Sequence, residues 1–125
     1  MQPLLLNLGR VLIASIFLIS GVRKALGFAG TAQFMQSKGL PSAEILLMAT
    51  IALELIGGLM IVFNRFAAPA AVLLAGFCVL SGAIFHNFWA AEAAQYQSQL
   101  NHFLKNVALA GGLLFIAGSS SPERS

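Results

Sequence analysis

The stretch Ile45-Leu-Leu-Met-Ala-Thr-Ile-Ala-Leu-Glu54-Leu-Ile-Gly57-Gly58-Leu-Met-Ile-Val-Phe63 decides the fold, because it is apolar nearly throughout and carries one acid near its middle. A helix rises about 1.5 Å per residue, so about 20 apolar residues cross the hydrocarbon core of a bilayer. Glu54 would then lie near the midplane, where a charged side chain costs roughly 3 kcal/mol on insertion scales. The stretch therefore predicts a transmembrane helix whose acid is either protonated or paired with a cation.

The composition of the whole chain agrees with a membrane protein. Of its 125 residues, 58% are hydrophobic and 9% are charged, and the mean hydropathy is +0.87. Four spans with their loops use nearly the whole length, so we expect no separate soluble domain. The net charge is +3, but the Lys and Arg residues are scattered, which favours interfacial anchors and intramembrane partners over a nucleic-acid surface.

Four apolar runs predict spans at about residues 4–24, 44–63, 66–88 and 100–118, followed by a disordered tail at 119–125. The first run lacks a preceding basic segment and an Ala-x-Ala site, which favours a span over a cleaved signal peptide. The link at Asn64 and Arg65 is short, so the second and third spans should be antiparallel neighbours. The sequence thus predicts an all-α, antiparallel four-helix membrane bundle with both termini on one side, here called side A.

The first loop, on the opposite side B, has a mixed composition from residue 27 to 41. It predicts a short interfacial helix, with Thr31 as its cap and Gly39 as its end. Cations on the two sides give a narrow preference for side B in the cytoplasm. Those on side B are Arg23, Lys24 and Lys38, against Arg65 and Arg124 on side A.

Helical spacing also predicts which faces pack together. In the first span one stripe should face inward, while the apolar residues between its members should face lipid. The inward stripe is Asn7, Arg10, Ala14, Phe17, Gly21 and Lys24, and the lipid face includes Leu5, Leu8, Leu12, Ile16 and Ile19. Small residues allow close helix contacts, and the glycines expected in this role are Gly21, Gly57, Gly58, Gly82, Gly111 and Gly112.

Counting residues by depth predicts two polar layers. Arg10 falls about 9 Å and Glu54 about 13 Å below side A, so we expect an ion pair between them. That pair would either fix the helix register or handle protons or substrate. Near side B the count gathers a basic cluster, a candidate site for a quinone or an anionic head group, although Lys24 alone would also suit an interfacial anchor. The cluster consists of Lys24, His86, His102 and Lys105.

Other kinds of site find little support in the sequence. Neither His86 nor His102 has an acid or thiol at ligand spacing, so no metal site is predicted. Cys78 is the single cysteine, which excludes an internal disulfide, and its apolar surroundings indicate packing. We find no catalytic nucleophile with a base, no Cys-x-x-Cys and no phosphate loop.

Taken in order, these residues resemble the DoxX family of small four-span bacterial membrane proteins. The resemblance covers nearly the whole chain, and its marks are listed here in sequence order: Arg10, Gly21-Val-Arg-Lys24-Ala, Phe34, Lys38-Gly-Leu-Pro41, Glu54-Leu-Ile-Gly57-Gly58, Arg65, His86, and Phe103-Leu-Lys105-Asn106-Val-Ala-Leu-Ala-Gly111-Gly112. The family takes its name from a subunit of a thiosulfate:quinone oxidoreductase, and other relatives are described as partners in redox or thiol-stress complexes. The resemblance implies a plasma-membrane protein with a quinone or redox association.

Three hypotheses about function follow. The first is a non-catalytic or accessory subunit of a quinone-linked membrane redox complex, in which the basic cluster receives the ligand. The second is a small-molecule transporter or exporter that titrates Glu54 and acts as a homo-oligomer, since one four-span chain offers little cavity. The third is a structural or chaperone-like membrane adaptor that contacts partners through its small-residue faces.

Overall fold

The computed structural model describes residues 1–120, and within them it contains helices and no strand. Four of the helices, one of them continued by the 3₁₀ turn η1, are long and apolar enough to cross a membrane, which confirms the predicted all-α fold. The elements are α1 (Gln2–Leu26), α2 (Phe28–Ser37), α3 (Ala43–Val62), α4 (Ala67–Phe85), η1 (Phe88–Ala90) and α5 (Ala93–Ser119).

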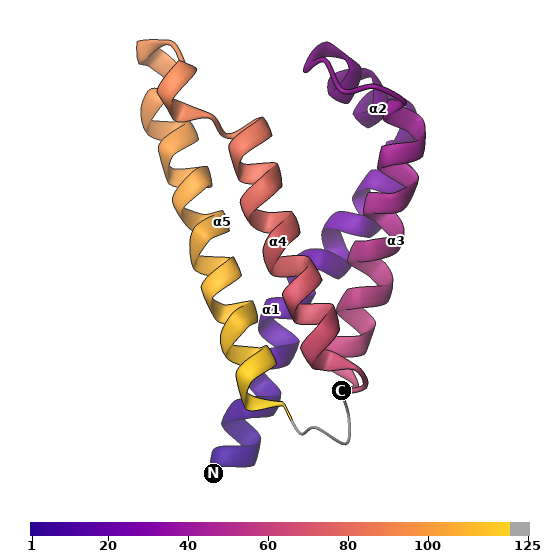
Figure 1. Ribbon diagram of the computed structural model, residues 1–125, viewed down its shortest axis with the longest axis vertical. Coiled ribbons are helices and arrows are strands. Elements are labelled where there is room, and N and C mark those ends of the chain that lie inside the picture. Colours follow the sequence, from indigo (N-terminus) through magenta and orange to yellow (C-terminus); the bar gives the residue numbers. More distant parts are fainter. Residues whose placement is uncertain (121–125) are drawn as a thin grey trace.

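The four long helices form two pairs that open like a V (Figure 1). One pair consists of α1 packed along α3, and the other of α4 packed along α5. The pairs meet near the α3–α4 turn, where α1 starts and α5 ends, and they diverge towards α2 and η1. The narrow end is therefore side A and the wide end is side B.

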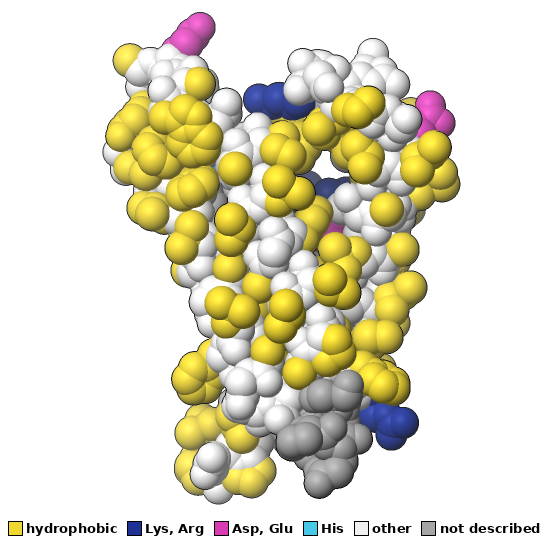
Figure 2. Space-filling model, in the orientation of Figure 1, with side chains coloured by type: hydrophobic (Ala, Val, Ile, Leu, Met, Phe, Trp, Pro, Cys, Tyr) yellow, Lys and Arg dark blue, Asp and Glu magenta, His cyan; other side chains and the backbone are white. Residues whose placement is uncertain are grey.

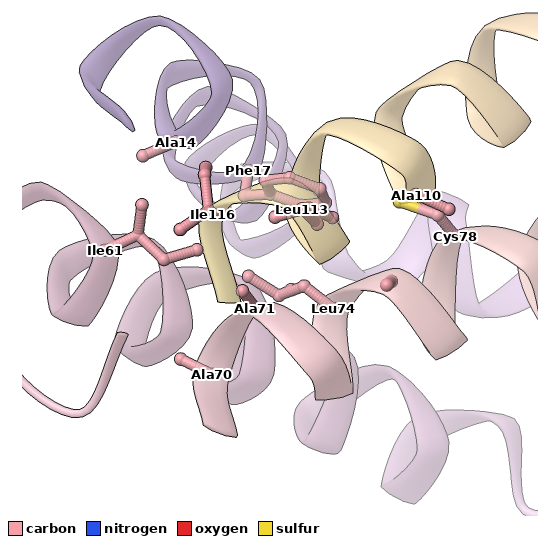
Figure 3. Packing of buried hydrophobic residues seen from close by; sticks show 11 residues of the cluster. Ala14, Phe17, Ile61, Ala70, Ala71, Leu74, Cys78, Ala110, Leu113 and Ile116 are labelled. Atoms are coloured by element: carbon pink, nitrogen blue, oxygen red, sulfur yellow. The ribbon is translucent and has the colours of Figure 1, made fainter. Parts of the chain in front are cut away.

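The narrow end is held by a dry core to which all four long helices contribute (Figure 3). Three leucine and isoleucine side chains at its centre are fully buried, and alanines around them let the helix backbones approach. The buried members are Ala14, Phe17, Ile61, Ala70, Ala71, Leu74, Ala75, Cys78, Ala110, Leu113 and Ile116. This core fixes the point from which the two pairs diverge.

A second, smaller cluster fixes the wide end of the α1–α3 pair. It consists of Ala32 and Met35 of α2 against Ala43 and Leu47 of α3, with Phe85 packed on it from α4. The short helix predicted in the first loop is thus present and lies folded over the start of α3. Thr31 does not cap it, because α2 begins at Phe28 after the cap residue Gly27 and Thr31 lies inside the helix.

The end of α2 follows the prediction more closely. Gly39 has φ +82°, a left-handed conformation that suits glycine, and its N–H donates to Gln36 O. The start of α5 differs from the predicted span, which begins at about residue 100: the helix begins at Ala93, so residues 93–99 are already helical. Of the expected tail, residues 121–125, including Arg124, lie outside the described residues.

The inward face predicted for α1 is found in its central part. Ala14, Phe17 and Gly21 are buried, while the residues predicted to face lipid, Leu5, Leu8, Leu12, Ile16 and Ile19, are exposed. Asn7 departs from the prediction and is exposed, because the first turns of α1 run past the α3–α4 turn and have no helix beside them (Figure 1).

Glycines provide the closest helix contacts. A Cβ at Gly21 would lie 2.8 Å from Leu55 Cγ, and one at Gly58 would lie 2.8 Å from Leu18 Cδ2. Gly57, Gly82 and Gly112 likewise face side chains of neighbouring helices. Gly111 was predicted to pack in the same way, and this is wrong. It has no neighbouring atom within 4 Å of a Cβ, since it lies about 100° around the helix from Gly112.

The crossing of α1 and α3 therefore depends on the absence of a side chain at Gly21. We predict that Gly21→Val lowers the free energy of unfolding by about 1–3 kcal/mol, because Leu55 would have to leave its place. The matched control is Gly76→Val on α4, where nothing lies within 4 Å, and there the change should stay within about 0.5 kcal/mol. Unfolding in detergent, followed by circular dichroism, measures both; equal losses in the two variants would contradict the close contact.

Candidate functional site

Glu54 is buried in the middle of α3, with 2% of its surface exposed. Its carboxylate oxygen Oε1 lies 2.7 Å from Nζ of Lys24, near the end of α1. The same ammonium group donates to Ser20 Oγ at 2.8 Å and lies 5.9 Å from the centre of the Phe77 ring. The Lys24 cation, which the Ser20 hydroxyl helps to hold in place, thus offsets the cost of burying the acid on α3.

The structure does not form the predicted ion pair between Arg10 and Glu54. Arg10 instead hydrogen-bonds Asn7 within its own helix. The depth count failed because it began both helices at the same level, whereas α1 starts beyond the α3–α4 turn (Figure 1). The contacts of Gly21 with Leu55 and the Glu54 Cβ give the true register, in which Lys24 lies one turn from the level of the acid.

A cavity of about 340 Å³ lies above the narrow core, between the two helix pairs, and the Lys24–Glu54 pair is part of its wall. Figure 2 shows an opening through this wide part of the molecule, with atoms of basic and acidic side chains at its lower edge. All five α-helices contribute to the lining, which combines apolar and polar side chains. The polar ones are Ser20, Lys24, Thr31, Thr50, Glu54, Cys78, Ser81, His86 and Asn106.

Asn106, midway along α5, supplies a fixed polar group opposite the ion pair. Its amide nitrogen donates to the carbonyl oxygen of Cys78 at 3.1 Å and to Ser81 Oγ at 3.4 Å, both on α4. These two bonds use the donors of the amide, and among the described residues its own oxygen receives no hydrogen bond. Gly82 makes the arrangement possible, because a Cβ there would lie 3.2 Å from the amide nitrogen.

His86 and His102 lie together at the wide end. Their rings stack with centroids 4.9 Å apart, and His86 Nδ1 lies 2.9 Å from Oε1 of Gln99. With Gln99 Oε1 as the acceptor, the neutral tautomer that fits this contact carries its proton on Nδ1, and its Nε2 can then accept a hydrogen bond. His86 lines the cavity, whereas His102 is exposed behind it.

The predicted basic cluster is therefore divided. Lys24 and His86 share the cavity, but Lys24 is neutralised by Glu54, while His102 stands behind His86 and Lys105 is exposed on α5. Sequence counting missed the polar groups Ser20 and Asn106. Ser20 could have been predicted beside Lys24, because residues four apart on a helix lie on the same face.

Aromatic side chains border the cavity on the side of α2 and α4. Phe34 and Phe85 stack with ring centroids 5.7 Å apart and bridge the two helix pairs. Both rings line the cavity. Within residues 1–120 no group of three or more His, Cys, Asp or Glu side chains is placed to hold a metal ion.

Residues 5–87 match the family profile described as DoxX. The chain belongs to the DoxX family. Two similar proteins from Escherichia coli strain K12 align over most of both sequences: inner membrane protein YphA, 32% identical over 93% of this chain and 83% of the relative, and inner membrane protein YqjF, 34% identical over 86% and 78%. Putative oxidoreductase CatD of Bacillus subtilis strain 168 is 41% identical over 60% of this chain and 53% of its own length. No solved structure matches the chain.

Membership in the DoxX family and the four spans together give the location. The two Escherichia coli relatives are inner membrane proteins, and this chain has four helices able to cross a bilayer. It is a multi-pass protein of the bacterial inner membrane, and the exposed apolar surfaces of its helices contact lipid.

The ion pair should behave as a coupled unit. We predict that Lys24→Met costs on the order of 3 kcal/mol, because it leaves the buried Glu54 without a cation. Glu54→Gln should cost less, since 28% of the Lys24 side chain is exposed and its ammonium can turn towards water. The double variant should lose less unfolding free energy than the two single variants lose together. Unfolding in detergent measures this coupling.

Glu44→Gln is the matched control for this cycle, because Glu44 is an exposed acid in the first turn of the same helix. It should change the unfolding free energy by less than about 0.5 kcal/mol. Strictly additive losses for Lys24→Met and Glu54→Gln would contradict a direct ion pair.

Proposed function

We propose that this DoxX protein is an accessory subunit of a membrane redox complex and that its cavity holds the head group of a quinone-type molecule. The observation that carries the proposal is the cavity itself, a hydrogen-bonding pocket at the depth of the bilayer interior. Its volume of about 340 Å³ is at the lower end of the range for small-molecule sites. The redox association is supported by the name of the relative CatD, to which 60% of this chain aligns.

The charge balance of the cavity favours a neutral head group over an anion. Lys24 would attract an anion if it were free, but its charge is compensated by Glu54 at 2.7 Å. An ammonium group has three N–H donors, and the bonds to Ser20 and Glu54 leave one of them available. A quinone carbonyl could accept from this donor without disturbing the ion pair.

Acceptors on the other walls complement that donor. The second carboxylate oxygen of Glu54, the Asn106 oxygen and Nε2 of a neutral His86 can each accept a hydrogen bond. Hydroxyl groups of Thr50 and Ser81 can do both. A ring that bears carbonyl groups when oxidised and hydroxyl groups when reduced finds partners in both states.

Quinone content of the purified protein tests the proposal. Protein extracted gently from its own membrane and studied by native mass spectrometry, with solvent extraction in parallel, should carry quinone. Lys24→Met and Glu54→Gln should lower the amount bound by about tenfold, equivalent to the loss of one charge-assisted hydrogen bond.

Glu44→Gln again serves as the control, and it should leave the quinone content unchanged because Glu44 lies outside the cavity. A well-folded wild-type protein that carries lipid but no quinone would refute the proposal. The same would follow if deletion of the gene left quinone-linked respiration under thiol stress unaltered.

One feature of the cavity favours transport as a second candidate. The cavity lies at the wide end, the apolar core closes the narrow end, and the ionisable pair lies between them. One-sided access to a carboxylate is what a proton-coupled carrier needs in one of its states. Native mass spectrometry that finds only quinone-free oligomers would favour this candidate, and a bare monomer would count against both.

A further inference from the structure

The gap between α1 and α5 is open at mid-membrane depth. The two helices touch near side A, where Ile13 packs on Gly112, a position at which a Cβ would lie 2.8 Å from Ile13 Cδ1. One turn further towards side B, Ile16 and Leu109 already line the cavity from opposite sides. The helices therefore separate directly above the narrow core.

A second hollow of about 610 Å³ runs along the outside of α1 and reaches Thr31 of α2. Ile16, Ser20, Lys24 and Thr31 border both this hollow and the cavity, so the two hollows adjoin each other along α1. Its remaining residues are Ser15, Ile19 and Arg23 of α1, so its outer part spans about 12 Å along the helix. The wall of the cavity on the side of α1 therefore consists of side chains that also border the outer surface of that helix.

Two of the residues that border the outer hollow are exposed isoleucines of α1. Ile16 is 47% exposed and Ile19 is 59% exposed, and both lie well inside a helix that crosses the membrane. The cavity is polar with balanced charge, whereas Ile16 and Ile19 present apolar surface on the outer face of α1, beside the polar residues Ser15 and Arg23. An occupant that fits both surfaces has a neutral hydrogen-bonding head and an apolar tail.

On the side of α2 and α4, the stacked Phe34 and Phe85 rings bridge these two helices. No such ring pair is found between α1 and α5 in the described residues.

We propose that the cavity takes its ligand sideways from the bilayer through the opening between α1 and α5, and that this ligand is an amphiphile with a neutral head and an apolar tail. The inference rests on the proposed function for the location of the head group, and it adds the route and the need for a tail. Ile16 is then the side chain that sets the width of the opening.

The single cysteine offers a direct test, because Cys78 lines the cavity. In native membranes, N-dodecylmaleimide should label Cys78 faster than a sulfonated maleimide confined to water. Ile16→Trp should slow the labelling by dodecylmaleimide by about tenfold, or about 1.4 kcal/mol of added barrier, and Ile16→Ala should accelerate it.

Two controls make the result specific. Leu12→Trp places the same bulk on the exposed face of α1, outside both hollows, and should have no effect. Cys78→Ser should remove the label altogether. Faster labelling by the sulfonated reagent, or a rate that responds to neither of the two Ile16 variants, would overturn the lateral route.

The same assay separates this inference from the proposed function. A decyl-substituted quinone should protect Cys78 from dodecylmaleimide. If it gives no protection while the Ile16 variants behave as expected, the proposed quinone site is wrong and the lateral route stands. If it protects and the Ile16 variants have no effect, the route is wrong and the quinone site stands.

Discussion

The burial of one carboxylate constrains the rest of this structure. Glu54 lies near the middle of a membrane-spanning helix, where water is not available to solvate it, so a cation must reach it from a neighbouring helix. Lys24 does so only because α1 crosses α3 closely, and that crossing depends on Gly21 facing Leu55 without a side chain. The ion pair therefore depends on the close helix contact, and the helix contact depends on the glycine.

The V shape follows from where polar residues stand along the helices. Towards side A the facing residues are alanine, leucine and isoleucine, which pack without leaving space. Towards side B the same faces carry Lys24, Glu54, Asn106 and His86, whose hydrogen bonds need specific partners and do not fill space efficiently. The helix pairs consequently separate at the level of the ion pair, and the cavity lies where the apolar core ends.

The sequence was sufficient to predict much of the fold, because hydropathy alone identifies membrane spans. It identified four spanning helices, the short helix after α1 and the lipid face of α1. The sequence did not show which charged residues pair with each other within the membrane. Predicting Lys24 rather than Arg10 as the partner of Glu54 required the relative height of α1 and α3, and a hydropathy profile does not define where a helix that projects from the bilayer begins.

Similar reasoning explains why the basic cluster was only partly recovered. Depth counting places residues at a level but says nothing about their direction around the helix. His102 and Lys105 were predicted at the level of the cavity, yet both are exposed, while Asn106, the next residue along, turns inward to α4. A step of one residue rotates a side chain by about 100°, so the membership of a polar site depends on helix rotation as much as on depth.

These constraints bear on what the cavity can bind. A pocket whose lysine was free would attract anions, which a bilayer interior admits poorly, whereas a compensated pair leaves hydrogen-bonding capacity without net charge. Since Lys24 retains a donor and several acceptors surround it, selectivity would come from the pattern of hydrogen bonds rather than from charge. The acid that forces α1 and α3 together thus also neutralises the lysine, so the interaction that stabilises the fold favours an uncharged ligand in the membrane.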